Sequence, residues 1–453
     1  MTCREVVELF LERSLRLDPE LHAFRTIVED RALNEADDAD RAIERGENIG
    51  VLHGIPIAVK DLEWTEGIRT TMGSLVYRDD VPASDSIAVE RLRESGAIVI
   101  GKTNTCEFGM QLESTNRLGP DTRNPWDTSK SSGGSSGGSA AAIAAGFAPL
   151  ATGSDSAGSI GNPSALCGVV GIKPTHGRIP LWPDPEDSHI MLDTGCIART
   201  VEDCALMLGV MAGEDSRDPV SIRGPAPVYR GENWRNLEKL RIGISTTFSG
   251  YPVDQEVRKL IGETAEVFKA LGHDLVEAEP KTHKPVYDIY MPLFLGDVHT
   301  AFDHLLSQRP MELDPVTVRT LEDARRVTLS EYVQALHRLA IFRRRIDEYF
   351  DQYDLLITPN NPVPAFDALN PPSHIDGLPV TQDWMPHLAF LAPWNLAGNP
   401  WITVPAGRSK NDLPIGALLV AAKGREDLLF AAAAALETEK PWINHASPFA
   451  PND

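Results

Sequence analysis

The chain has 453 residues, of which 42% are hydrophobic and 24% charged, and its formal net charge is −22. An acidic surface of this kind argues against nucleic acid or anionic membrane as a partner, because both bind positive surfaces. The sequence has no apolar run of about 18 residues that would predict a transmembrane helix. Its N-terminus has charges throughout and lacks the apolar core of a signal peptide, so we expect a cytoplasmic protein.

The five cysteines are an odd number without C-x-x-C spacing and without a nearby pair of histidines. This pattern predicts free thiols in a reducing compartment and argues against a zinc site. We therefore expect neither a metal nor a cofactor. A cysteine nucleophile is an alternative, but it accounts for fewer residues than the serines described below.

Residues 1–46 place apolar side chains at helical spacing, beginning with Val6, Val7, Leu9 and Phe10. They predict an N-terminal helical layer that packs on the body of the protein. From residue 51, short apolar runs alternate with helical segments, which is typical of an α/β fold whose sheet is buried on both faces. The expected strands are 55–59, 97–100, 240–244, 355–358 and 401–404. The expected helices are 86–95, 202–212, 255–271 and 330–349.

The most informative stretch is 131–164, where serines alternate with glycines and alanines around an apolar run at 140–145. The apolar run predicts a short buried helix between two glycine turns, which a flexible Gly/Ser linker would not contain. Each turn presents a serine among residues too small to cover backbone N–H groups, as a nucleophile beside an oxyanion site requires. A phosphate-binding loop is disfavoured because no Lys-Ser or Lys-Thr follows the glycines.

The two turns, G-G-S-S-G-G-S-A-A-A and G-S-D-S-A-G-S-I, resemble those of the amidase signature family. The segment G-I-P-I-A-V-K-D resembles the lysine segment of that family, and T-R-N-P-W-D and N-L-A-G-N-P-W-I-T-V-P-A-G also agree with it. The resemblance implies one α/β/α sandwich with a large mixed β-sheet, formed by a single domain over residues 1–453. Residues 281–390 follow the family least closely, and we expect them to form a variable substrate-pocket region.

The resemblance also implies a site. Ser159 would be the nucleophile, Ser135 the bridging serine, and Lys60 the base, which is plausible because burial at a strand end lowers the pKa of a lysine. The peptide bond between Gly134 and Ser135 is expected to be cis, and Asp155 to accept backbone N–H bonds that hold its loop. The oxyanion would lie among the backbone N–H groups of Ser156, Ala157, Gly158 and Ser159.

Gly161 stands where many members of the family have an arginine, and we expect it to open space beside the nucleophile. We therefore expect a hydrolase of uncharged, apolar or aromatic small-molecule carboxamides that works through an acyl-enzyme and acts as a monomer or homodimer. The same chemistry could extend to esters and carbamates (urethanes). The alternative is a glutamine-hydrolysing subunit of a tRNA-dependent amidotransferase, which the missing arginine disfavours.

Overall fold

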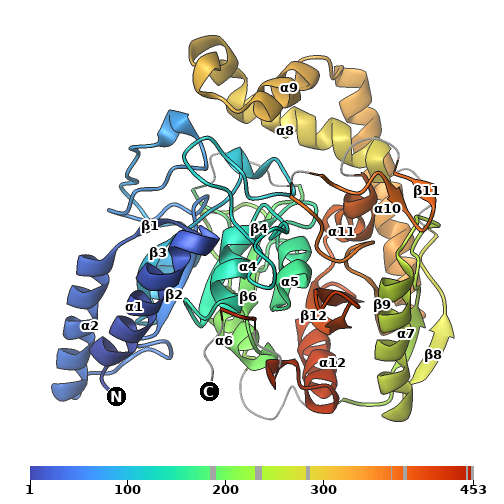
Figure 1. The fold of residues 1–453 in the computed structure, drawn as a ribbon. Helices are drawn as coiled ribbons and strands as arrows, with labels where there is room; N and C mark the ends of the chain where they lie inside the picture. The colour runs from blue at the N-terminus through green and yellow to red at the C-terminus, as the bar shows by residue number, and fades with distance from the viewer. Residues whose placement is uncertain are drawn as a thin grey trace.

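A computed structural model describes residues 1–183, 190–229, 237–281, 286–368, 370–380, 385–444 and 447–449. Within these residues, eleven strands form one mixed sheet in the order β1-β3-β2-β4-β6-β5-β12-β13-β9-β7-β8 (Figure 1). The strands are β1 (Phe24–Ile27), β2 (Pro56–Lys60), β3 (Ile98–Thr103), β4 (Leu150–Asp155), β5 (Val170–Lys173), β6 (Asp193–Ala198), β7 (Arg241–Ile244), β8 (Asp274–Glu277), β9 (Leu355–Pro359), β12 (Trp401–Arg408) and β13 (Pro414–Ala421). A separate hairpin joins β10 (His374–Ile375) to β11 (Leu378–Pro379).

The sheet has parallel pairs toward both flanks and antiparallel pairs through its middle, and its edge strand β1 is antiparallel to β3. Strand β2 pairs in parallel with β3 and β4, and β7 pairs in parallel with β8 and β9. Between them, β4, β6, β5, β12, β13 and β9 form consecutive antiparallel pairs. Each strand from β2 to β6 is buried along its whole length, as expected for a sheet covered on both faces.

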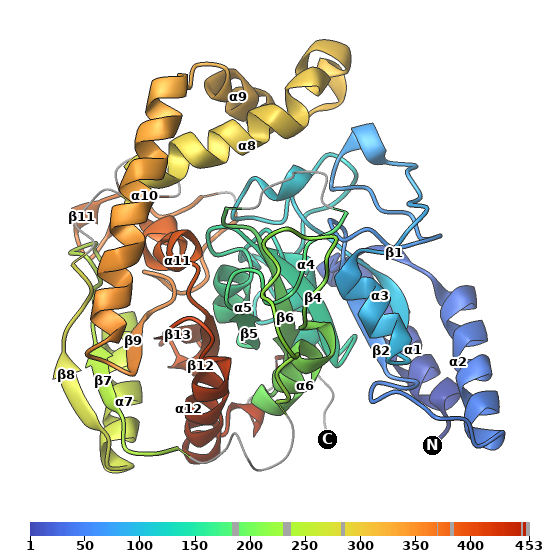
Figure 2. The same cartoon turned by 180° about the vertical axis from the view of Figure 1, so that it is seen from behind.

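Helices cover both faces of the sheet, which confirms the α/β/α sandwich. Helices α4 and α5 lie over the face seen in Figure 1, and α3 and α6 over the face seen in Figure 2. The helices are α1 (Cys3–Leu21), α2 (Glu29–Glu44), α3 (Ile87–Glu94), α4 (Gly137–Ala144), α5 (Gly161–Cys167), α6 (Val201–Met211), α7 (Gln255–Ala270), α8 (Val286–Gln308), α9 (Pro315–Ala324), α10 (Leu329–Phe350), α11 (Met385–Ala397) and α12 (Glu426–Glu439).

The N-terminal residues form the two helices α1 and α2, and between them a strand that the sequence did not predict. Helix α1 begins with a complete capping box, in which the side chains of Thr2 and Glu5 each accept a backbone N–H bond. Strand β1 extends the sheet by pairing with β3. It is only four residues long, too short for periodicity to distinguish it from a connection between helices.

Helices α8, α9 and α10 form one excursion from the sheet, between β8 and β9. Helices α8 and α9 lie above the rest of the fold in both views, and α10 runs back down past α11 toward β9 (Figures 1 and 2). Helix α8 also packs against α11. In the described residues, no helix combines the length and apolar character needed to span a bilayer.

Candidate active site

Lys60 is the last residue of β2 and is fully buried. Its side-chain Nζ donates hydrogen bonds to Ser135 Oγ at 2.7 Å and to Ser154 Oγ at 2.9 Å. A third contact, at 3.3 Å, joins Nζ to the carbonyl oxygen of Ser154. The backbone N–H of Lys60 donates to Thr152 Oγ1, so β4 fixes both ends of this residue. The lysine thus contacts one of the two expected serines directly.

Ser135 lies in the first glycine turn, just before α4. The Gly134–Ser135 peptide bond is cis, as expected. A side chain at Gly134 would collide with the backbone of Glu113, whose N atom would lie 2.5 Å from the added Cβ. Glycine is therefore required there for the two loops to approach each other.

Ser159 lies in the second glycine turn, between β4 and α5. Its carbonyl oxygen accepts the N–H of Ser136 at 3.1 Å, which ties the two serine turns together. The described residues contain no hydrogen bond between Ser135 Oγ and Ser159 Oγ, although both serines line the same pocket. Catalytic hydrogen bonds in unliganded enzymes are often long and shorten when substrate binds.

Asp155 shapes the second turn through its buried carboxylate. Oδ1 accepts the N–H of Gly158 at 2.6 Å, and Oδ2 accepts those of Ile160 at 2.5 Å and Gly161 at 3.4 Å. Burial raises the pKa of Asp155, and the bonds from Ile160 and Gly158 oppose that rise. The same contacts correct one expectation: the N–H of Gly158 donates to Asp155, so it is not a free donor for an oxyanion.

Three other N–H groups of this turn remain available. Among the described residues, the backbone N–H groups of Ser156, Ala157 and Ser159 donate no hydrogen bond. Ala157 and Ser159 are nevertheless buried, at 4% and 6% exposure. Buried backbone donors without a partner are uncommon, because each costs free energy comparable to a lost hydrogen bond. The turn therefore presents donors to whatever binds in the pocket.

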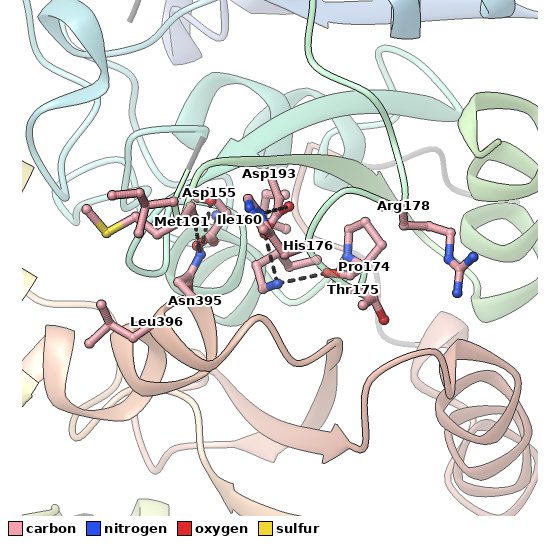
Figure 3. Close-up of polar contacts among 12 residues, drawn as sticks. Asp155, Ile160, Pro174, Thr175, His176, Arg178, Met191, Asp193, Asn395 and Leu396 are labelled. Carbon is pink, nitrogen blue, oxygen red and sulfur yellow. Dashed lines mark hydrogen bonds and ion pairs between the residues drawn. The ribbon is translucent and has the colours of Figure 1, made fainter. Parts of the chain in front are cut away.

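Helix α11 packs directly on this turn (Figure 3). Asn395 Nδ2 donates to Asp155 Oδ1 at 2.9 Å, to the carbonyl oxygen of Asp155 at 3.0 Å, and to that of Met191 at 3.3 Å. Leu391 leaves no room for a side chain at Gly158 or Gly161. The expectation that Gly161 opens space beside the nucleophile is therefore wrong: Leu391 and two further side chains, Asn360 and Trp401, fill that space.

A buried ionic cluster lies behind the turn. Asp193 on β6 is the direct cross-strand partner of Asp155. Its carboxylate accepts from Lys173 Nζ at 3.1 Å and contacts His176 Nδ1 at 2.9 Å (Figure 3). Burial by itself would raise the pKa of Asp193, but the charges of Lys173 and His176 bring it below its usual value. The cluster holds β5 and β6 together behind the serine turn.

The pocket in front of the serines has apolar walls. It is lined by Ser135, Ser154, Ser156 and Ser159 together with Thr194, Ser86 and Glu63. Its larger apolar residues are Leu62, Trp64, Met72, Phe108, Leu181, Trp182, Leu192 and Phe294. Phe294 comes from α8, in the segment expected to be variable, whereas Tyr290 of the same helix belongs to the core. Trp384 belongs to the range 281–390 that we expected to form the variable substrate-pocket region, and it lies outside the described residues.

Neither a thiol nor a metal offers a competing centre in the described part of the chain. All five cysteines are buried and unpaired, and burial raises the pKa of Cys106, for example, to about 12. A thiol of that pKa is a poor nucleophile near neutral pH. No group of three His, Cys, Asp or Glu side chains is placed to hold a metal ion in these residues.

Sequence reasoning missed Ser154, Asn395 and the pair Lys173–Asp193. Ser154 carries a weak signal, because it stands in the strand that leads into the second turn. The other three are 14 to 236 residues away from Ser159, and nothing in their local sequence connects them to it. Ser136 and Ser139, the other serines of the first turn, donate to backbone carbonyl oxygens, those of Ser154 and Thr152.

A protein-family model and curated proteins match the chain over nearly its whole length. The Amidase family model matches residues 5–430. An acylamidase from Rhodococcus erythropolis is 34% identical over 449 residues, which cover 97% of this chain and 92% of the relative. A glutamyl-tRNA(Gln) amidotransferase subunit from Thermosynechococcus vestitus is 35% identical over 464 residues, which cover 97% of this chain and 95% of the relative.

Solved structures with the same architecture include a bacterial aryl acylamidase of the amidase signature enzymes, with a TM-score of 0.88 and 27% identity over 98% of this chain and 94% of the other. The peptide amidase from Stenotrophomonas maltophilia has a TM-score of 0.81 and 28% identity, and the match covers 97% of this chain and 94% of that one. These similarities extend over both serine turns and the lysine strand.

Proposed function

The chain belongs to the amidase family and hydrolyses C–N bonds of amides, and on this premise we propose that it is a serine hydrolase of small uncharged carboxamides with an apolar or aromatic group. The observation that carries the proposal is the 2.7 Å contact between Lys60 Nζ and Ser135 Oγ, in a pocket shared with Ser159. Lys60, Ser135 and Ser159 would be its catalytic residues.

The proposed reaction begins with Lys60 in its neutral form. Lys60 takes the proton of Ser135, Ser135 takes that of Ser159, and Ser159 Oγ attacks the amide carbonyl carbon. The tetrahedral intermediate collapses as Ser135 returns a proton to the leaving nitrogen, and the amine departs. Water then attacks the acyl-enzyme through the same relay, which releases the carboxylic acid and restores Ser159.

The negative charge of the intermediate needs donors fixed in advance. The free N–H groups of Ser156, Ala157 and Ser159 supply them, and Asp155 and Asn395 keep the turn in shape. Donors held in a buried site stabilise developing charge without reorganising, which accounts for a large part of the rate enhancement in acyl transfer.

The pocket supports apolar substrates, because aromatic and aliphatic side chains form most of its wall. Carbamates and esters pass through the same type of tetrahedral intermediate, so we include both as substrates. Glutamine hydrolysis within an amidotransferase complex remains the alternative, because relatives of that kind match the chain equally well.

The test compares Ser159→Ala with Ser164→Ala on an aryl amide, an aryl carbamate, an aryl ester and glutamine. Ser164 Oγ is buried on α5 without a partner among the described residues, so its removal is a matched control. We expect Ser159→Ala to lose more than about 10³-fold in kcat while its unfolding temperature is retained, and Ser164→Ala to stay active. Glutamine as the best of the four substrates would favour the amidotransferase instead.

A further inference from the structure

The pocket contains a single formal charge among its described lining residues, the carboxylate of Glu63. Its other polar lining groups are hydroxyls and backbone, and the rest of its wall is apolar. Glu63 comes three residues after Lys60, and its N–H donates to the carbonyl oxygen of Lys60 at 3.0 Å, which forms a tight turn at the end of β2. The sequence therefore places an acid beside the reacting groups.

Two hydroxyls hold this carboxylate in place. Thr194 Oγ1 donates to Oε1 at 2.7 Å, and Ser86 Oγ donates to Oε2 at 3.0 Å. Thr194 is the cross-strand partner of Ser154, the residue that also contacts Lys60. Glu63 is thus fixed at the same end of the pocket as the base.

The carboxylate of Glu63 can accept more hydrogen bonds than it does. A carboxylate offers about four acceptor positions, and the two hydroxyls occupy two of them. Glu63 is only 8% exposed, and among the described residues no Lys, Arg or His nitrogen makes a direct ion-pair contact with its carboxylate. The nearby Lys102 donates to the backbone carbonyl oxygen of Glu63 and to Thr65 Oγ1, not to the carboxylate. The charge of Lys102 acts on Glu63 from a distance, but the remaining acceptor positions of the carboxylate have no hydrogen-bond donor among the described residues, and a buried polar group gains free energy when such positions are filled.

We propose that Glu63 is a specificity-determining residue that binds a cationic or N–H-donating nitrogen of the substrate. The preferred substrate would then carry two nitrogen groups: the scissile amide at Ser159 and an amine, or another N–H group, at Glu63. Substrates with a carboxylate at that position would be rejected by charge repulsion in a poorly solvated site. This inference rests on the proposed amide hydrolysis in the same pocket, and it revises one part of that proposal: the preferred substrate carries an amine or another N–H group at Glu63 and need not be uncharged.

The test uses three 4-nitroanilides of equal chain length, with 5-aminopentanoyl, hexanoyl and 5-carboxypentanoyl groups. A second series places the same three end groups on the leaving aniline of acetanilides. For the wild type we expect kcat/KM to rank cationic above neutral above anionic in at least one series. In Glu63→Gln, which retains the shape, the ratio of cationic to neutral kcat/KM should fall at least tenfold, and the ratio of anionic to neutral should rise.

The control is Glu66→Gln, which removes the same charge from an exposed residue of the same loop and should leave both ratios unchanged. An equal loss on all three substrates in Glu63→Gln would mean that Glu63 only supports the fold, and the proposal would be overturned. The same conclusion would follow if the wild type did not favour the cationic substrate in either series.

A binding measurement separates this proposal from the proposed function. Calorimetry on Ser159→Ala gives the Kd of the uncleaved aminopentanoyl and hexanoyl anilides, with and without Glu63→Gln. Preferential binding of the amine that is lost in the double variant supports Glu63 even if no anilide is hydrolysed. Cleavage of the hexanoyl anilide without any amine preference supports the hydrolase and overturns the role of Glu63.

Discussion

Lys60 and its two serine contacts show how the environment of one residue can define a reaction. Its side-chain Nζ is buried, and the contacts that fix it include Ser135 Oγ, Ser154 Oγ and one carbonyl oxygen. A surface lysine would sample many rotamers, whereas this one is held against the hydroxyl that it would deprotonate. Single substitutions of Lys60 and Ser135 can therefore test the proposed proton relay.

Lys60→Met and Ser135→Ala should each lower kcat by about 10³-fold or more, and the double variant should be scarcely slower than either single one. Groups that act in one relay are not additive, because removal of any member disables the others. Stopped-assay kcat values and unfolding temperatures of the three variants check this. Multiplied losses in the double variant would show that the two residues act independently.

Asp155→Asn should reduce kcat by about 10²-fold with little change in KM. The amide can accept only at its oxygen, so at least one of the N–H bonds from Gly158 and Ile160 is lost and the turn relaxes. Steady-state kinetics with an aryl amide measures the effect. A rise in KM at constant kcat would place Asp155 in substrate binding instead.

At the scale of elements, α8 contributes to the pocket through one aromatic side chain. Phe294 lines the pocket, and its ring stacks on Tyr290 at a centroid distance of 5.5 Å. Its neighbours on the helix face the core or solvent: Leu293 is fully buried, and Tyr287 is 43% exposed. The helix thus provides a wall to the pocket and none of the proposed proton-transfer groups.

Phe294→Ala should raise KM for aryl amides by about tenfold and leave kcat within about threefold, because it removes apolar contact area that the ground state and transition state share. Tyr287→Ala on the same helix is the control and should match the wild type. Equal kinetics for the two variants would mean that substrates do not reach α8.

The sequence predicted strands β2, β3, β7, β9 and β12 and helices α3, α6, α7 and α10, since apolar runs and helical spacing determine them locally. It did not predict β4, β5, β6 and β13, which form most of the middle of the sheet. It also predicted the two glycine turns that carry Ser135 and Ser159, through motifs contained within 131–164. It could not predict that α11 packs on the second glycine turn, because the hydrogen bond from Asn395 to Asp155 joins residues that are 240 positions apart. Two other features also depend on tertiary packing that the sequence does not show: the hydrogen bond from the Gly158 N–H to Asp155, and the side chains that fill the space beside Gly161.

At the scale of the whole molecule, buried carboxyls connect stability to pH. Burial raises the pKa of Glu113 to about 7 from 4.5, and its principal counteracting contact is a hydrogen bond from Ser131. A raised folded-state pKa means that the folded protein holds a proton that the unfolded chain has lost between pH 4.5 and 7. The contribution of Glu113 is complete below pH 4.5 and is lost as pH rises through 7.

Urea unfolding at about pH 5 and about pH 7.5 should therefore show a loss of stability with rising pH that is larger in the wild type than in Glu113→Gln. The wild type should lose at most about 3 kcal/mol more free energy of unfolding than Glu113→Gln over this pH range, which is the free energy equivalent of the full pKa shift of Glu113. Identical pH dependence in the two proteins would mean that Glu113 is not buried in its neutral form.

The proposed catalytic residues and part of the pocket wall come from separate regions of the chain. Lys60, Ser135 and Ser159 lie within one hundred consecutive residues, whereas Phe294 belongs to an excursion of three helices inserted between β8 and β9. Insertions, deletions and recombination in that excursion can alter the far wall of the pocket without moving the lysine strand or either serine turn. Related proteins can therefore change their substrate range while they keep the same catalytic residues. Directed evolution can likewise vary the helical excursion and leave residues 60–159 unchanged.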